Sequence, residues 1–321
     1  MTLTSVPHGR TARRLEWPFL PPHVRDLVAD RCGAPVVGAE SRTSGFTPGF
    51  ASVLTCADGS RHFVKAASVV AQRAIAQSYR EEARKLAALP QTVPAPQLRW
   101  SHDGDDWVVL GIEHVDHVPP ARPWRPEDLD RVVEALAFAA DALTPPPAGL
   151  ELDPLAAEMA DWPAYWGRVR AGGLARGLDV PGLEEHLDEA AALAASALEV
   201  AGGDTVVHTD VRDDNVLLAA DGRVLLCDWN WPVRGAAWFD TVALVIGPHG
   251  DGLDVDAVLA RSPLTRDVPA DHVDAVLALH AGYFLLMQDQ PVPPTSPFLR
   301  TAQRWNAEAT WDLLARRRGW S

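Results

Sequence analysis

Residues suited to chemistry gather in two short segments of this sequence, His208–Asn215 and Cys227–Trp229. Their spacing is H-x-D-x4-N, followed by 12 residues and a further Asp. The first segment predicts a loop that holds Asp210 and Asn215, and two strand-like runs then return the chain to Asp228. Mg²⁺ prefers hard oxygen ligands and leaves positions for substrate phosphates. The spacing therefore predicts metal binding by Asn215 and Asp228, with Asp210 facing a nucleophile.

Short acidic segments such as R-D-D-N and D-W-N are also common as solvated turns, so the spacing alone is weak evidence. Two features favour a functional interpretation. Asparagine occurs only at positions 215, 230 and 306, and Asp228 follows an apolar strand-like run. An Asp and an Asn in one loop, followed by a metal-binding Asp, is the arrangement of protein kinases.

The elements that must position these groups differ between the two parts of the chain. Residues 34–65 and the segments up to Val115 alternate between apolar runs and turns, and Ala57–Ser60 has the composition of a hairpin turn. Residues 70–89 have helical periodicity. The first ~110 residues therefore predict antiparallel strands with one inserted helix.

Long helices are predicted in the second part of the chain, where a strand–turn–strand insert around Asp221-Gly222 interrupts them. These helices begin near Pro126 and cover 126–143, 182–200, 271–289 and 298–317. The expected organisation is a β-rich lobe at 1–112, a hinge at 113–118 and a helical lobe at 119–321.

Composition excludes several classes of protein. The chain has 29 basic and 43 acidic residues, a net charge of −14, which argues against a nucleic-acid binder. Cys32, Cys56 and Cys227 are widely spaced, so we expect neither a disulfide framework nor a structural zinc. The N-terminus lacks the apolar stretch of a secretory signal, and no run of residues is apolar enough to span a membrane. A cytoplasmic monomer or dimer is expected.

Lysine is rare, because only Lys65 and Lys85 occur among the 29 basic residues. Lys65 ends the strand-like run R-H-F-V-K and precedes the helix that carries Glu81 and Glu82. An ammonium is a compact point charge, whereas a guanidinium is a wider planar fork. We therefore expect Lys65 to occupy a site where arginine does not fit, and Lys85 to lie on the exposed part of the helix.

With these motifs, the sequence resembles the aminoglycoside phosphotransferase family, which has a protein-kinase-like fold. H-T-D-V-R-D-D-N and C-D-W-N are similar to its catalytic loop and metal motif. The similarity extends over about residues 34–250 and includes F-V-K-A (63–66), Y-R-E-E-A-R-K-L (79–86), W-V-V-L-G-I-E-H-V (107–115) and W-F-D-T-V-A-L (238–244).

The resemblance implies an α+β fold of two lobes, a small antiparallel β lobe with one helix and a larger, mainly helical lobe. It implies Mg²⁺ as cofactor and ATP or GTP as phosphate donor. The resemblance implies that Asp210 is the catalytic base and that Asn215 and Asp228 are Mg²⁺ ligands. It implies nucleotide binding by Lys65, by Ser44 and by the backbone of Glu113, His114 and Val115. His208 and Asp240 are implied to give structural support. Glu82 is the better candidate to pair with Lys65, and Glu81 stays possible.

Two positions depart from the family pattern. Thr209 replaces the usual glycine, which a threonine can do if its φ is negative. The segment G-A-E-S-R-T-S-G-F-T-P-G-F, which includes Ser44, lacks a G-x-G-x-x-G motif, so its contacts with phosphate are the least defined.

The predicted function is O-phosphorylation of an antibiotic or related natural product, aminoglycoside-like or nucleoside- or macrolide-like. There are three alternatives. The first is a kinase for a sugar, choline-like or amino-alcohol metabolite, and the second is a nucleotide-binding pseudokinase. The third is a metal-dependent hydrolase that uses His208, Asp210 and Asp228. The net charge and the acidic segment 251–256 favour a cationic acceptor over a neutral one.

Overall fold

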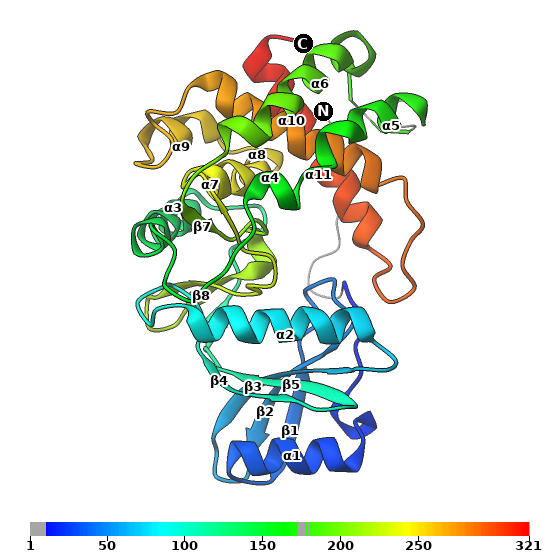
Figure 1. Ribbon diagram of the computed structural model, residues 1–321, viewed down its shortest axis with the longest axis vertical. Coiled ribbons are helices and arrows are strands. Elements are labelled where there is room, and N and C mark those ends of the chain that lie inside the picture. The colour runs from blue at the N-terminus through cyan, green and yellow to red at the C-terminus, as the bar shows by residue number, and fades with distance from the viewer. Residues whose placement is uncertain (1–10, 173–176, 179, 321) are drawn as a thin grey trace.

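A five-stranded antiparallel sheet forms the centre of the N-terminal lobe (Figure 1). The computed structural model describes residues 11–172, 177, 178 and 180–320, so residues 1–10 of the predicted lobe and Ser321 lie outside it. The strand order is β1-β2-β3-β5-β4. The strands are β1 (Val36–Ser41), β2 (Phe50–Cys56), β3 (Arg61–Ser68), β4 (Leu98–Asp103) and β5 (Trp107–Ile112). The predicted hairpin turn is confirmed, since Thr55 pairs with Arg61 across it.

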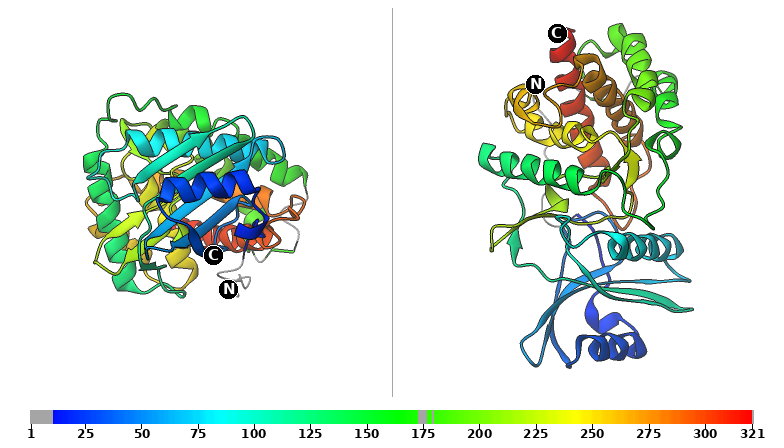
Figure 2. Two further views of the ribbon diagram at one scale, coloured as in Figure 1. Left: turned by 90° about the horizontal axis from the view of Figure 1, so that it is seen from below. Right: turned by 60° about the vertical axis from the view of Figure 1, so that its left-hand side comes forward.

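One helix covers each face of this sheet (Figure 2). Side chains alternate between the faces of a strand, so Val64 and Ala66 of β3 pack towards α1 (Pro22–Cys32), whereas Ala67 packs towards α2 (Arg73–Ala88). Helix α2 is the one that the sequence predicts. Helix α1 was not expected, because it buries only Val24 and Val28 and has little helical periodicity.

Helices make up most of the C-terminal lobe, and in its core α10 packs against both α6 and α11. The four predicted long helices are confirmed as α3, α6, α10 and α11, with ends that differ by one or two residues. The helices are α3 (Pro126–Ala142), α4 (Leu155–Glu158), α5 (Tyr165–Ala171), α6 (Leu183–Val200), α7 (Phe239–Leu244), α8 (Ile246–Gly250), α9 (Val255–Arg261), α10 (Ala270–Met287) and α11 (Leu299–Arg318). Within the described residues, no helix is long and apolar enough to cross a membrane.

Short strands in the C-terminal lobe lie where the two lobes meet. They form two small sheets, β10-β7 and β6-β8-β9. The strands are β6 (His117–Val118), β7 (Thr205–Val207), β8 (Val216–Ala219), β9 (Val224–Leu226) and β10 (Val233–Gly235). Residues 113–116 connect β5 of the first lobe to β6 of the second. The predicted turn at Asp221-Gly222 joins β8 and β9, and its glycine has a φ of 92°.

Candidate active site

A buried carboxylate holds the loop that follows β7. Asp240, on α7, accepts hydrogen bonds from the backbone N–H groups of His208 (2.6 Å) and Thr209 (2.8 Å). Thr209 does not meet the condition of a negative φ, because its φ is 67°. A β-branched residue is strained in this region. The two bonds to Asp240, and a bond of 2.9 Å from the Thr209 hydroxyl to the carbonyl of Trp231, hold it there.

Both ring nitrogens of His208 are engaged inside the protein. Nε2 lies 2.8 Å from the carbonyl oxygen of Cys227, which can only accept, so Nε2 carries the proton. Nδ1 accepts from the backbone N–H of Asp210 at 3.3 Å. Burial lowers the pKa of His208, in agreement with a neutral ring. The ring therefore connects the Asp210 loop to the segment that precedes Asp228.

Asp210 and Asn215 are joined directly. The side-chain amide of Asn215 donates to the backbone carbonyl and to Oδ2 of Asp210, at 2.9 Å each. Asn215 is buried, whereas the Asp210 side chain is 35% exposed. Arg212 lies 2.9 Å from the other oxygen of Asp210 and also binds Asp214 at 2.6 Å. Withdrawal from solvent raises the pKa of Asp210.

Lys65 lies between two carboxylates, one from each lobe. Its ammonium is 2.7 Å and 2.9 Å from the two oxygens of Glu82, and it also contacts Asp228. Burial acts to lower the pKa of Lys65, but the charges of Asp228 and Glu82 outweigh it and raise that pKa. Glu81 instead pairs with Arg84 at 3.0 Å on the surface. The partner of Lys65 is therefore Glu82.

Asp228 follows β9 and has a φ of 63°. Burial opposes its ionisation, yet the neighbouring Lys65 lowers its pKa, so it is a carboxylate. The other lysine supports the same segment, since Lys85 donates to the carbonyl of Asn230 at 2.8 Å. The expectation that Lys85 is exposed is wrong. Its face of α2 packs against the second lobe, which helical periodicity alone does not indicate.

The donor set fits a Mg²⁺ ion. The amide nitrogen of Asn215 donates its hydrogen bonds to Asp210. Within the described part of the chain, no donor reaches the amide oxygen of Asn215. One oxygen of Asp228 binds Lys65, and the second has no donor among the same residues. A side-chain amide oxygen and a carboxylate oxygen beside a phosphate site are typical Mg²⁺ ligands.

A cleft between the lobes collects most of the predicted nucleotide-binding residues. Its volume, open mouth included, is about 960 Å³. The predicted residues that line it are Ser44, Lys65, Glu82, Glu113, His114, Val115, Asn215 and Asp228. Asp210, His208 and Asp240 lie outside its lining. Asp210 and His208 are in the loop that carries Asn215, and Asp240 is on α7.

The connection between the lobes presents backbone groups to this cleft. The Glu113 side chain is held by Arg223 at 3.1 Å, and the Val115 carbonyl accepts from His117 at 2.7 Å. Among the described residues, neither the carbonyl of Glu113 nor the N–H of Val115 has a partner. One acceptor and one donor two residues apart suit the edge of a purine.

Sequence analysis missed Arg14, which lines the cleft. The N-terminal segment reaches the cleft because Thr11 donates to the carbonyls of Ser44 (2.5 Å) and Gly45 (2.8 Å). Arg14 donates to the carbonyl of Gly49 at 3.2 Å, and its buried Nε has no partner among the described residues. The segment has no motif or periodicity that would have identified Arg14.

Two aromatic side chains near Asp210 were also missed. Trp162 and Tyr283 stack with ring centroids 4.1 Å apart and planes 13° apart. Both are partly exposed. The pKa of Tyr283 is raised mainly by burial and, to a smaller extent, by the negative charge of Asp210. The Tyr283 hydroxyl is therefore close enough to Asp210 to be affected by its charge. Many tryptophans are simply core residues, and their spacing in the sequence did not distinguish Trp162.

The acidic segment 251–256 carries little free charge. Asp251 binds Arg122 at 2.7 Å and the backbone N–H of Trp124 at 2.8 Å. Asp254 caps α9, and Asp256 pairs with Arg317. This segment therefore gives little support to a cationic acceptor, because Asp251 and Asp256 are paired with arginines and Asp254 caps a helix.

The two lobes and the cleft between them define a kinase-like enzyme. The model of the phosphotransferase enzyme family matches residues 54–276. The chain belongs to this family and is a phosphotransferase. No curated protein sequence matches the chain at a significant level.

Solved structures of similar fold include three enzymes with different acceptors. A thermostable mutant aminoglycoside phosphotransferase, in a ternary complex with AMP-PNP and hygromycin B, has a TM-score of 0.60 and 13% identity over 92% of this chain and 99% of its own. Choline kinase LicA from Streptococcus pneumoniae has a TM-score of 0.57 and 11% identity over 88% and 99%. Macrolide 2'-phosphotransferase type I has a TM-score of 0.55 and 19% identity over 88% and 95%. At these identities the likeness shows the fold alone.

Proposed function

We propose that the protein transfers the γ-phosphate of ATP or GTP to a hydroxyl group of a small natural product such as an antibiotic. One observation carries this proposal. Lys65, held by Glu82 and Asp228, lines a cleft together with Asn215, whose amide fixes Asp210 at the edge of the same cleft. A phosphate-binding cation, two metal ligands and a base are thus arranged around one space.

The residues act on the two reactants as follows. Asp210 accepts the proton of the acceptor hydroxyl, whose oxygen forms a bond to the γ-phosphorus. The bond from that phosphorus to the bridging oxygen breaks, and its electron pair leaves with the nucleoside diphosphate. Lys65 and Arg14 offset the charge of the phosphates, and the Glu113 carbonyl and Val115 N–H hold the base. Transfer of this kind depends mainly on positioning and electrostatic stabilisation.

Asn215 and Asp228 would hold Mg²⁺. When bound, the ion neutralises the phosphate oxygens and orients them. Lys65 already neutralises one oxygen of Asp228, which keeps that carboxylate ionised in a buried site. Asn215 and Asp228 are therefore already in place for a cation, and their side chains do not need to be reorganised when it binds.

The stacked Trp162–Tyr283 pair provides a wall for the acceptor on the Asp210 side. Exposed aromatic faces bind sugar and macrocycle rings through apolar contact, and they also attract cations. Asp251 is paired with Arg122 and Asp256 with Arg317, so the segment 251–256 gives no local argument for a cationic acceptor. The proposal of a natural-product acceptor with sugar or macrocycle rings is therefore supported by this aromatic wall.

Two of the alternatives, a pseudokinase and a hydrolase, fit the site less well. A pseudokinase would not need Lys65, Asp210, Asn215 and Asp228 together. A hydrolase that uses His208 to activate water needs a free ring nitrogen, and both nitrogens of His208 are engaged. A kinase for a metabolite such as a sugar or a choline-like alcohol uses the same machinery and differs only in the acceptor.

A mass-spectrometric screen tests the proposal. The protein is incubated with Mg²⁺, with ATP and GTP in separate reactions, and with hydroxylated aminoglycosides, macrolides, nucleosides, sugars and amino-alcohols. A phosphate-sized mass gain on an antibiotic, absent with Asp210→Asn, is the expected result. A gain only on a sugar or amino-alcohol would identify a metabolic kinase. Mg-nucleotide binding without transfer to any acceptor would favour a pseudokinase.

A further inference from the structure

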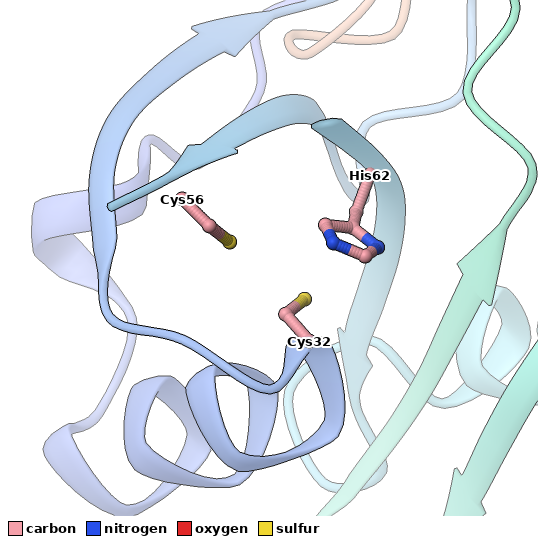
Figure 3. Close-up of side chains that lie close together, drawn as sticks. All are labelled: Cys32, Cys56 and His62. Carbon is pink, nitrogen blue, oxygen red and sulfur yellow. The ribbon is translucent and has the colours of Figure 1, made fainter. Parts of the chain in front are cut away.

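Three side chains that bind soft metals converge at the end of the N-terminal lobe, away from the cleft (Figure 3). They are Cys32, Cys56 and His62, and one ligand atom from each lies within 4.8 Å of the others. Figure 3 shows that all three side chains point into the space between the end of α1 and the β2–β3 hairpin. None of them lines the cleft between the lobes.

The three residues come from three elements, which is why their spacing in the sequence gave no metal motif. Cys32 ends α1, Cys56 ends β2, and His62 is the second residue of β3. The expectation of no structural zinc rested on the absence of a local Cys/His spacing. The fold supplies the proximity that the sequence does not.

Regular backbone holds these positions. Cys56 donates its N–H to the carbonyl of Ser60 at 2.9 Å across the hairpin turn, and His62 is paired with Leu54 on β2. Helix α1 ends at Gly33, whose φ is 85° and whose N–H bonds to the carbonyls of the last turn. Ligands on ordered strands and helix ends are positioned more precisely than ligands on loops.

The chemistry of the cluster selects its ligand. Cys32 and Cys56 are free thiols, and two sulfurs with one imidazole are a typical ligand set for Zn²⁺. Cys56 is buried, whereas Cys32 and His62 are partly exposed, so solvent reaches two of the three residues. The Asp58 carboxylate nearby, which accepts from Ser60 at 2.7 Å, adds negative charge beside the cluster.

We propose that Cys32, Cys56 and His62 bind one Zn²⁺ ion, with water in the fourth position. The ion would fasten α1 to the β2–β3 hairpin. Because β3 also carries Lys65, three residues after His62, the ion would also stiffen the strand that enters the cleft. This site does not depend on which acceptor the cleft takes.

Zinc competition tests the site. The full-length protein is reduced, stripped with a chelator, and titrated with Zn²⁺ against a chromophoric chelator in excess Mg²⁺, which occupies the oxygen ligands of the cleft. We expect one Zn²⁺ per chain. The variant Cys32→Ser/His62→Gln should lose at least about 100-fold in affinity. His102→Gln, which changes another histidine of the same lobe, is the matched control and should bind like the unaltered chain.

Two further readouts identify the ligands. Co²⁺ bound at the site should show thiolate-to-metal charge-transfer absorption, which the double variant should lack. Zn²⁺ should raise the melting temperature of the unaltered chain and of His102→Gln by several degrees, but not that of the double variant. If the double variant folds poorly, His62→Gln alone should still weaken binding. Equal zinc binding by all variants, or none by the reduced unaltered chain, would overturn the proposal.

Discussion

One side-chain amide, that of Asn215, binds both the backbone carbonyl and the carboxylate of Asp210. The two bonds fix the direction of the carboxylate before any substrate arrives. They also turn the amide oxygen of Asn215 away from Asp210 and leave it available to a cation. The proposed base and the proposed metal ligand are therefore oriented by the same interaction.

Asp210→Asn separates chemistry from binding. Asparagine keeps an oxygen that can accept from Asn215, but it cannot take the proton of the acceptor hydroxyl. We expect kcat to fall on the order of 10² or more, while Mg-nucleotide affinity, measured by calorimetry, changes by no more than a few fold. Turnover close to that of the unaltered enzyme would remove Asp210 from the role of base.

Lys65→Arg tests whether the space between Glu82 and Asp228 admits only an ammonium. A guanidinium keeps the charge but is wider and planar. We expect kcat/KM to fall at least tenfold, about 1.4 kcal/mol. Lys85→Arg is not a neutral control, since Lys85 is buried against Asn230.

The control for this experiment is the reverse exchange, Arg61→Lys, at the exposed start of the same strand. Arg61 forms only a surface pair with Asp116, and such pairs contribute little. Steady-state kinetics should therefore be unchanged. Equal and small effects at Lys65 and Arg61 would mean that Lys65 does not hold the phosphates.

Arg14→Gln tests the contribution of the N-terminal segment to nucleotide binding. Removal of a cation that faces phosphates should raise the KM for the nucleotide about tenfold, as expected for a charged hydrogen bond of roughly 1.5 kcal/mol. The change in kcat should be small. Arg13→Gln is the matched control, because Arg13 is exposed and its backbone bond to Thr295 is kept. If both variants behave alike, Arg14 does not contact the phosphates.

Local patterns were enough to place the residues that sit in one short stretch of chain. Asp210 and Asn215 share a loop, and a single hairpin returns Asp228 to it, so the spacing and the apolar run before Asp228 together predict that they meet. The fold class followed from strand and helix periodicities and from the family resemblance. The pairing of Lys65 with Glu82 followed from that resemblance.

The features that sequence analysis missed depend on contacts between distant segments. Arg14 reaches the cleft from the N-terminus, and Lys85 is buried only because the second lobe covers its helix. Cys32 joins Cys56 and His62 only after α1 packs on the sheet. A periodicity describes one element, so it cannot indicate which neighbour covers that element.

The stability of the protein should depend on pH through His208. Burial lowers the pKa of His208 below its ordinary value of 6.5. Below that pH the unfolded chain binds a proton that the folded chain refuses, so the free energy of unfolding falls as the pH falls. One such group contributes a slope of up to about 1.4 kcal/mol per pH unit.

Urea unfolding between about pH 7.5 and 5.5 measures this slope. His208→Gln should have a shallower slope than the unaltered chain, because glutamine does not titrate. His272→Gln, on a partly exposed position of α10, should leave the slope unchanged. An unchanged slope in His208→Gln would show that this ring is not the titrating group.

Thr209 occupies a left-handed conformation that costs a residue other than glycine about 1–2 kcal/mol. Thr209→Gly and Thr209→Ala both lose the hydroxyl bond to the Trp231 carbonyl, but only glycine also removes the strain. The greater backbone entropy of glycine offsets about 0.5–1 kcal/mol of this gain. The free energy of unfolding should therefore be about 0.5–1 kcal/mol higher for the glycine variant than for the alanine variant. If alanine is equal or better, the hydrogen bonds that Asp240 accepts leave no strain at this position.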